Sequence, residues 1–148
     1  MRGFLFAILM LAGVAPRCWA DVLGPFGADP GAQCRQAIAA AEQAQAIPAR
    51  LLASIGVVES GRRDPTSGVV TPWPWTVDAD GAGYFYPTKQ AAIEAVRAFQ
   101  ANGTHSIDVG CMQVSLLHHP DAFADLQQAF DPGTNARWAA GFLRRLYL

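Results

Sequence analysis

The sequence lacks the patterns that identify several large classes of enzyme. HExxH and CxxC spacings, which supply ligands in many zinc proteins, are absent, as are the GxSxG nucleophile motif and the glycine-rich loops that bind phosphate. His105, His118 and His119 do not form a ligand-spaced group, because the last two are adjacent and diverge on any regular element. We therefore expect neither a metal ion nor a cofactor.

The chain also lacks an excess of charge. Its formal net charge is −1 over 148 residues, which gives no electrostatic reason to expect a nucleic acid or an anionic membrane as partner. The length suits one domain with a hydrophobic core and is short for two. No repeat or long linker divides it.

No apolar run is long enough for a comfortable membrane span, but the N-terminus resembles a secretory signal peptide. Within Met1–Ala20, Arg2 precedes the apolar stretch Phe4–Val14, and a cleavage site follows at Ala20, with Ala15 as a competing cut. We expect a periplasmic or otherwise secreted protein that has no membrane attachment after cleavage.

Cleavage would leave residues 21–148 as one domain with two cysteines, Cys34 and Cys111. An even count in an exported protein predicts a disulfide. Two buried free thiols are the alternative.

Periodicity predicts a mainly helical α+β fold. Five helices are expected: Ala32–Gln45, Pro48 to a stop at Gly61, Thr88–Asn102, Asp121–Phe130, and a last helix from Pro132 on. Trp75–Val77 and Tyr84–Tyr86 are expected to pair as a hairpin. Ser106–Leu117 is an apolar run without periodicity. Cys34, Ile38 and Ala41 would form the buried side of the first helix, and Ala92, Ile93, Val96 and Phe99 that of the third.

Glu59 is the candidate catalytic residue. At helical spacing it shares a face with Leu52, Ile55 and Gly56, and it lies in the last turn, where the helix dipole disfavours a negative charge. Apolar neighbours and the dipole both favour the protonated carboxyl, which a general acid needs near neutral pH. The alternative is a surface glutamate paired with a neighbouring arginine.

The aromatic residues of the hairpin region are a second candidate feature. Trp73, Trp75, Tyr84 and Tyr86 are many large rings for so small an element, and they would suit the wall of a sugar-binding cleft. The alternative is a hairpin that its tryptophans attach to the core.

Three motifs together resemble the soluble lytic transglycosylase family. They are Glu59-Ser60-Gly61 at a helix end, Gly110-Cys111-Met112-Gln113, and Asn135 in the Asp-Pro-x-x-Asn start of the last helix. The similarity covers Cys34–Leu148 and is greatest to small members associated with secretion or pilus machines of the cell envelope. It implies a lysozyme-like fold with a small β-element beside the cleft, and glycan strands of peptidoglycan as the substrate.

The resemblance also implies the roles of individual residues. Glu59 would be the only catalytic acid and base, cleaving the β-1,4 bond between N-acetylmuramic acid and N-acetylglucosamine with a 1,6-anhydro product. Ser60 would orient Glu59 or a sugar amide, and Met112 and Gln113 would line the adjacent subsite. Asn135 would either contact the sugar or serve as a cap or packing residue of its helix. The family's tyrosine, which positions the glutamate, has no match, since Tyr147 belongs to the last helix. Either the protein is a shortened member of the family, or another group positions the glutamate.

Other readings of the same pattern remain open. A glycosidase with two carboxylates needs a partner acid at a defined separation, and Asp64, Asp78, Asp80 and Asp108 are the candidates. A lysozyme-like hydrolase would deliver water in place of the muramoyl 6-hydroxyl. An inactive glycan-binding or scaffolding domain would keep the cleft without turnover.

Overall fold

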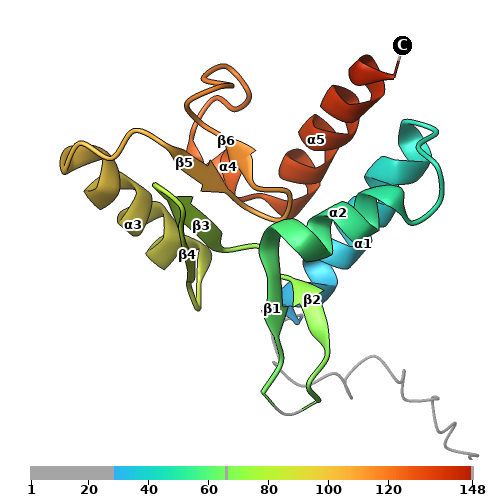
Figure 1. Cartoon of the computed structure of the whole chain (residues 1–148), viewed down its shortest axis with the longest axis horizontal. Helices are drawn as coiled ribbons and strands as arrows, with labels where there is room; N and C mark the ends of the chain where they lie inside the picture. The colour runs from blue at the N-terminus through green and yellow to red at the C-terminus, as the bar shows by residue number, and fades with distance from the viewer. Residues whose placement is uncertain (1–28, 66, 148) are drawn as a thin grey trace, which may run out of the picture.

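Short, locally specified elements build a mixed α+β structure (Figure 1). The computed structural model describes residues 29–65 and 67–147, so the predicted signal peptide lies outside the described residues. The helices are α1 (Pro30–Ala44), α2 (Leu51–Ser60), α3 (Lys89–Ala101), α4 (Leu126–Ala129) and α5 (Pro132–Leu146). The strands are β1 (Gly61–Arg63), β2 (Val70–Pro72), β3 (Thr76–Ala79), β4 (Ala82–Phe85), β5 (Ile107–Val109) and β6 (Val114–Ser115). Within the described ranges, no helix has the length and apolar content needed to cross a bilayer.

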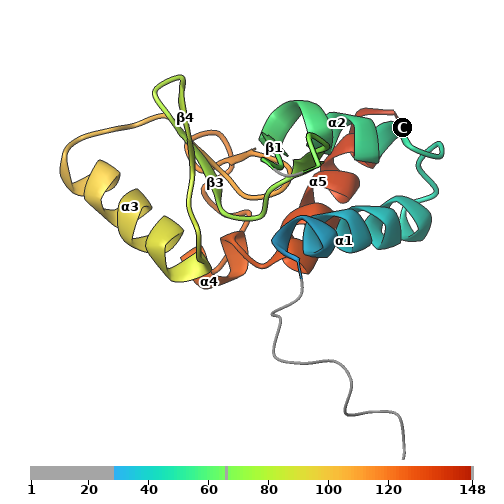
Figure 2. The ribbon, with the colours of Figure 1, turned by 90° about the horizontal axis from the view of Figure 1, so that it is seen from below.

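Helices α1, α2 and α5 form one half of the molecule, and the sheet of β3 to β6 with α3 forms the other (Figures 1 and 2). Helix α1 packs along α5 and α2. The predicted inner face of α1 is confirmed, because Cys34, Ile38 and Ala41 are buried. Asp29 caps α1 by accepting a hydrogen bond from the Gly31 N–H, so the helix begins before the predicted Ala32.

The predicted start of α2 near Pro48 is wrong. The helix begins at Leu51, after Arg50 in the left-handed conformation with φ of 69°. Glu42 of α1 caps it from outside, since its carboxylate accepts hydrogen bonds from the backbone N–H groups of Arg50, Leu52 and Ala53 at 2.6, 2.9 and 3.3 Å. A negative charge at a helix N-terminus satisfies unpaired donors and complements the dipole. The local sequence carries no sign of this cap.

The predicted stop of α2 at Gly61 is confirmed. A Cβ at this position would collide with the carbonyl oxygen of Val57, so only glycine allows the chain to leave the helix here. The chain then forms a small antiparallel hairpin of β1 and β2, which the sequence did not predict.

The hairpin of β3 and β4 is confirmed, with a register that pairs Val77 with Tyr84 and strand bounds that differ by one to two residues from those predicted. Its turn uses Asp80 and Gly81, both with positive φ (52° and 86°), as a two-residue hairpin turn requires. The sheet order is β4-β3-β5-β6, and all pairs are antiparallel. Strands β5 and β6 lie in the run predicted as aperiodic, because strands of three and two residues are too short to show alternation.

Helix α3 is confirmed, with its cap at Thr88 and its buried Ala92, Ile93 and Val96 packed in the core of the sheet half. The helix predicted over Asp121–Phe130 is wrong in its extent. Only Leu126–Ala129 is helical, because Asp125 accepts a hydrogen bond from the Gln128 N–H and thereby fixes the start.

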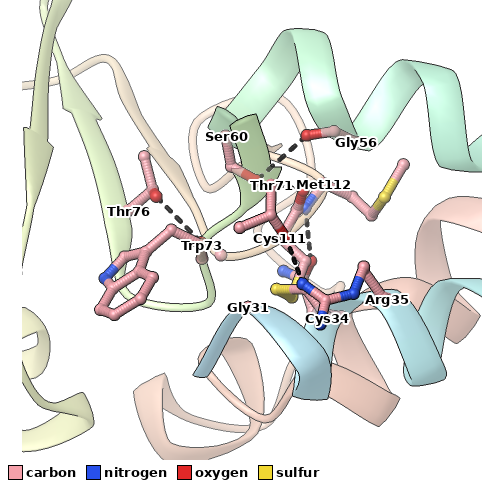
Figure 3. The surroundings of a disulfide bond; sticks show 12 residues. Gly31, Cys34, Arg35, Gly56, Ser60, Thr71, Trp73, Thr76, Cys111 and Met112 are labelled. Atoms are coloured by element: carbon pink, nitrogen blue, oxygen red, sulfur yellow. Dashed lines mark hydrogen bonds between the residues drawn. A yellow bond between two sulfur atoms is a disulfide. The ribbon is translucent and has the colours of Figure 1, made fainter. Parts of the chain in front are cut away.

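Two apolar cores lie on either side of the segment from β5 to β6. Val109 belongs to the core under α3, whereas Cys111 and Met112 belong to the core between α1, α2 and α5. The predicted disulfide is present between Cys34 and Cys111, with Cα atoms 5.7 Å apart (Figure 3). It fixes the middle of this segment to α1.

Candidate functional site

A groove of about 270 Å³ lies between α2, the start of β6 and α5, and Glu59 opens onto it from the last turn of α2. Leu52 and Ile55 line the same groove, as expected from their shared helix face. Gly56, on the same helix face, lets the core pack closely, since a Cβ there would lie 2.7 Å from Cδ1 of Ile38 and 3.3 Å from Sδ of Met112. The remaining lining residues are Met112, Gln113, Val114, Ser115, His119, Trp138, Ala139, Phe142, Leu143 and Leu146.

The pKa of Glu59 is raised above its ordinary value. Partial desolvation by the largely apolar groove is the main cause, and the negative charge of Asp108 is the second. The side chain nevertheless keeps contact with solvent, since Glu59 is exposed at the surface. A carboxyl that is reachable and holds its proton to higher pH than usual is suited to donate that proton to a bound ligand.

Asp108, whose charge acts on Glu59, lies in the middle of β5 and is not among the residues that line the groove. The strand alternates between buried and half-buried residues, with Ile107 and Val109 in the core and Asp108 on the opposite face. Register places Asp108 directly between Asp78 on β3 and Ser115 on β6, so these three side chains share one face of the sheet. Ser115 itself lines the groove of Glu59.

The turn between β5 and β6 carries two of the predicted site residues, Met112 and Gln113. Gly110 and Gln113 both have positive φ, at 83° and 44°. The Gln113 side chain stabilises this turn, because its Nε2 donates to the carbonyl oxygens of Gly110 at 2.9 Å and Thr76 at 3.2 Å. Met112 is buried, with 6% of its surface exposed, and still forms part of the groove wall.

Asn135 holds the same turn from α5. It is fully buried; its Oδ1 accepts from the Met112 N–H at 2.9 Å, and its Nδ2 donates to the carbonyl oxygens of Val109 and Ala129 at 3.0 and 3.1 Å. A Cβ on Gly110 would overlap the Asn135 amide, so the glycine is needed for this approach as well as for its φ. The structure thus assigns Asn135 a packing role inside the protein.

Ser60 has a matching role on the other side of the turn. Its buried hydroxyl lies 2.7 Å from the carbonyl oxygen of Cys111 and 3.2 Å from that of Gly56, in the position to donate to either (Figure 3). The end of α2, which carries Glu59, is therefore tied directly to the turn that carries Met112 and Gln113.

Replacing Asn135 with alanine should destabilise the protein by about 3 kcal/mol or more. The change removes three buried hydrogen bonds, among them the bond that Asn135 accepts from the buried Met112 N–H. Urea unfolding of Asn135→Ala and of the wild type measures the difference. Asn135→Asp is the matched control, since it keeps an acceptor for Met112 and loses the two donated bonds. A loss below about 1 kcal/mol for the alanine variant would contradict this role.

The predicted aromatic residues do not line the groove of Glu59. Trp73 lines a second, larger groove of about 720 Å³ beside the β1–β2 hairpin, where the Arg62 guanidinium lies 4.3 Å from its ring centre. Its Nε1 donates to the carbonyl oxygen of Tyr86 at 2.7 Å. Trp75 packs edge-on against Trp73 and against the core of the sheet half. Tyr84 is 41% exposed and packs on Phe99.

Sequence reasoning missed a different aromatic group at the groove. Trp138 and Phe142 stack with 5.3 Å between ring centres and 10° between planes, and His119 lies 4.6 Å from Trp138. The i, i+4 spacing of the two rings in α5 was visible as an apolar stripe of a helix. The stripe continues to Leu146, which is 68% exposed. It therefore forms the wall of an open groove.

Within residues 29–65 and 67–147, no group of three or more His, Cys, Asp or Glu side chains is arranged to hold a metal ion. Comparisons of the chain with protein-family models, with curated proteins and with solved structures find no match.

Proposed function

We propose that this protein is a peptidoglycan lytic transglycosylase with a lysozyme-like fold, in which Glu59 is the catalytic acid and base. The observation that carries the proposal is the position of Glu59: its pKa is raised, and it opens onto a groove whose wall includes Met112 and Gln113. The motif resemblance connects the same three residues. Glu59 comes from α2, and Met112 and Gln113 come from the turn between β5 and β6. That these distant segments meet at the same groove supports a single binding site.

The reaction would proceed in two steps at this carboxyl. Protonated Glu59 donates its proton to the glycosidic oxygen of the β-1,4 bond, the C1–O bond breaks, and N-acetylglucosamine leaves as an alcohol. Glu59, now a carboxylate, accepts the proton of the muramoyl 6-hydroxyl as that oxygen bonds to C1. The product is a 1,6-anhydromuramoyl end, and the glutamic acid is restored with no water consumed.

The raised pKa of Glu59 fits both steps. A proton donor is most effective when its pKa lies near the working pH, because the acid is then both populated and able to give up the proton. The apolar groove wall favours the neutral acid before the first step. After the bond breaks, the positive charge at C1 favours the carboxylate.

The disulfide supports the proposed export of the chain. Such bonds persist in oxidising compartments, among them the periplasm, and the resemblance is to envelope proteins of that compartment. The proposed partners are glycan strands and, on the resemblance alone, a secretion or pilus machine.

Product mass tests the proposal. Residues 21–148 are incubated with purified peptidoglycan, and the soluble muropeptides are analysed by mass spectrometry. Anhydro ends, lighter than hydrolysed ends by one water, are the expected result. Reducing ends with the mass of added water would identify a hydrolase, and glycan binding without any product would identify a binding domain.

A further inference from the structure

The larger groove, of about 720 Å³, lies between the start of α1, one face of α2 and the β1–β2 hairpin. Ala53 and Val57 of α2 line it, whereas Glu59 lines the smaller groove. The two grooves therefore use different faces of the same helix. The proposed function leaves the larger one without a ligand.

The charged side chains of this groove leave an excess of positive charge. Three arginines and two aspartates line it. Among the described residues, the groove has one ion pair, between Arg35 and Asp29 at 3.1 Å. The carboxylate of Asp64 accepts hydrogen bonds from the backbone N–H and the hydroxyl of Ser67 at 2.6 and 2.8 Å. Both carboxylates thus have partners within the fold, and an anion is the ligand that complements the remaining charge.

Arg62 is the arginine best placed to bind that anion. Its guanidinium carbon lies 4.3 Å from the centre of the Trp73 ring, and it makes no hydrogen bond or ion pair with the described residues. A guanidinium that rests on an aromatic ring keeps the N–H groups at its edge for another partner. The fork of these N–H groups matches the two oxygens of a carboxylate. Since Arg62 is half-buried, such a pair would be partly shielded from water.

Thr71 connects Arg62 with a second guanidinium. Register pairs Thr71 on β2 with Arg62 on β1, so the two side chains share one face of the hairpin. The Thr71 hydroxyl accepts a hydrogen bond from Nη1 of Arg35 on α1 at 2.7 Å (Figure 3). Arg35 and Arg62 therefore reach the same side of the hairpin, and a ligand with several carboxylates would meet both.

The rest of the groove suits small apolar groups. Val57 of α2 and Val69 and Val70 of the hairpin line it and are exposed. Exposed branched side chains beside arginines form a surface for a ligand that combines methyl groups with negative charge. A peptide of small apolar and acidic residues has this composition.

The groove also lies within reach of a peptide attached to a sugar at Glu59. Glu59 and Arg62 are three residues apart, so their Cα atoms are separated by at most about 11 Å. An extended peptide of three to five residues spans about 10–17 Å. One ligand can therefore occupy both grooves.

We propose that this groove binds the acidic stem peptides of peptidoglycan, with the Arg62 guanidinium on a peptide carboxylate and the valines on alanine methyl groups. Stem peptides combine alanine with residues that carry carboxylates, so their size and charge complement the groove. The identity of the peptide rests on the proposed function. The selection of an acidic peptide rests on the groove alone.

Binding of the free stem peptide, released from purified peptidoglycan by an amidase, tests the inference. In proton–nitrogen NMR spectra of residues 21–148, the backbone amides of Arg62 and Thr71 and the indole N–H of Trp73 should shift to saturation. Arg62→Gln should weaken this binding by roughly 10- to 100-fold, the value of hydrogen bonds between charged groups. Arg97→Gln is the matched control, because Arg97 is an exposed arginine on α3 outside the groove, and it should leave the affinity unchanged.

Two further ligands keep the test decisive if Arg62→Gln does not fold. The same peptide with amidated carboxyl groups should bind the wild type at least 10-fold more weakly, and equal affinity would overturn the inference. Glycan strands without peptides should leave the hairpin signals unshifted. Strands that shift these signals and compete with the peptide would assign the groove to sugar instead.

NMR detects binding whether or not the protein cleaves its ligand, so the two proposals can fail separately. A wild type that binds the peptide at the hairpin and releases no product would reject the enzyme and keep the peptide site. A wild type that forms anhydro products and shows no shift at the hairpin would reject the peptide site and keep the enzyme.

Discussion

Glu59→Gln should reduce formation of anhydro products by about 10²- to 10⁴-fold, the usual contribution of a positioned general acid. Glutamine has nearly the same shape and cannot donate the proton or accept it back. The measurement is the rate of soluble muropeptide release from peptidoglycan by each protein. Glu94→Gln is the matched control, because Glu94 is an exposed glutamate on α3, away from the groove.

The same variant should be at least as stable as the wild type near neutral pH. Since the pKa of Glu59 is raised by folding, ionised Glu59 lowers stability as pH rises through that pKa, and a neutral side chain removes this cost. Thermal unfolding at pH 4 and pH 7 compares the two proteins. Full activity in folded Glu59→Gln would remove Glu59 from the mechanism.

Replacing both Cys34 and Cys111 with alanine should cost about 2–5 kcal/mol of stability, the usual effect of losing a native disulfide. The bond joins residues 77 apart in sequence, and both cysteines are buried in the core between α1, α2 and α5. Denaturant unfolding measures the loss. Wild type held reduced is the control, because it loses the bond and keeps both sulfur atoms.

Removing the disulfide should affect the groove of Glu59 as well as the stability of the fold. Cys111 precedes Met112 in the chain, and its carbonyl oxygen lies 2.7 Å from the Ser60 hydroxyl, next to Glu59. Product formation should therefore fall in the double variant even at temperatures where it remains folded. A variant with unchanged stability and unchanged activity would show that packing alone holds this segment.

The sequence was sufficient where the structure is specified locally. Helix α3 follows from its apolar spacing and from Thr88 and Asn102 at its ends, and the hairpin follows from Asp80-Gly81 between short apolar runs. The inner face of α1 and the disulfide followed from spacing and cysteine count. In the helices and the hairpin, the residues that determine the element lie within a few positions of one another. The disulfide could be predicted because only two cysteines follow the predicted signal peptide.

The sequence was insufficient to predict features that depend on residues far apart in the chain. Glu42 fixes the start of α2 from the preceding helix, and Asp108 acts on Glu59 from β5. The aromatic residues illustrate the same limit. Composition drew attention to Trp73 and Trp75, whereas tertiary packing brings Trp138 and Phe142 to the groove.

The packing of α1 against α5 has a consequence for when the site comes into being. The first and last helices of the described chain share one core, and Asn135 of α5 holds the turn that carries Met112. A growing or partly translocated chain that has not yet delivered α5 lacks the groove wall and the support of this turn. The proposed wall-cleaving activity would therefore begin only when the last helix has docked.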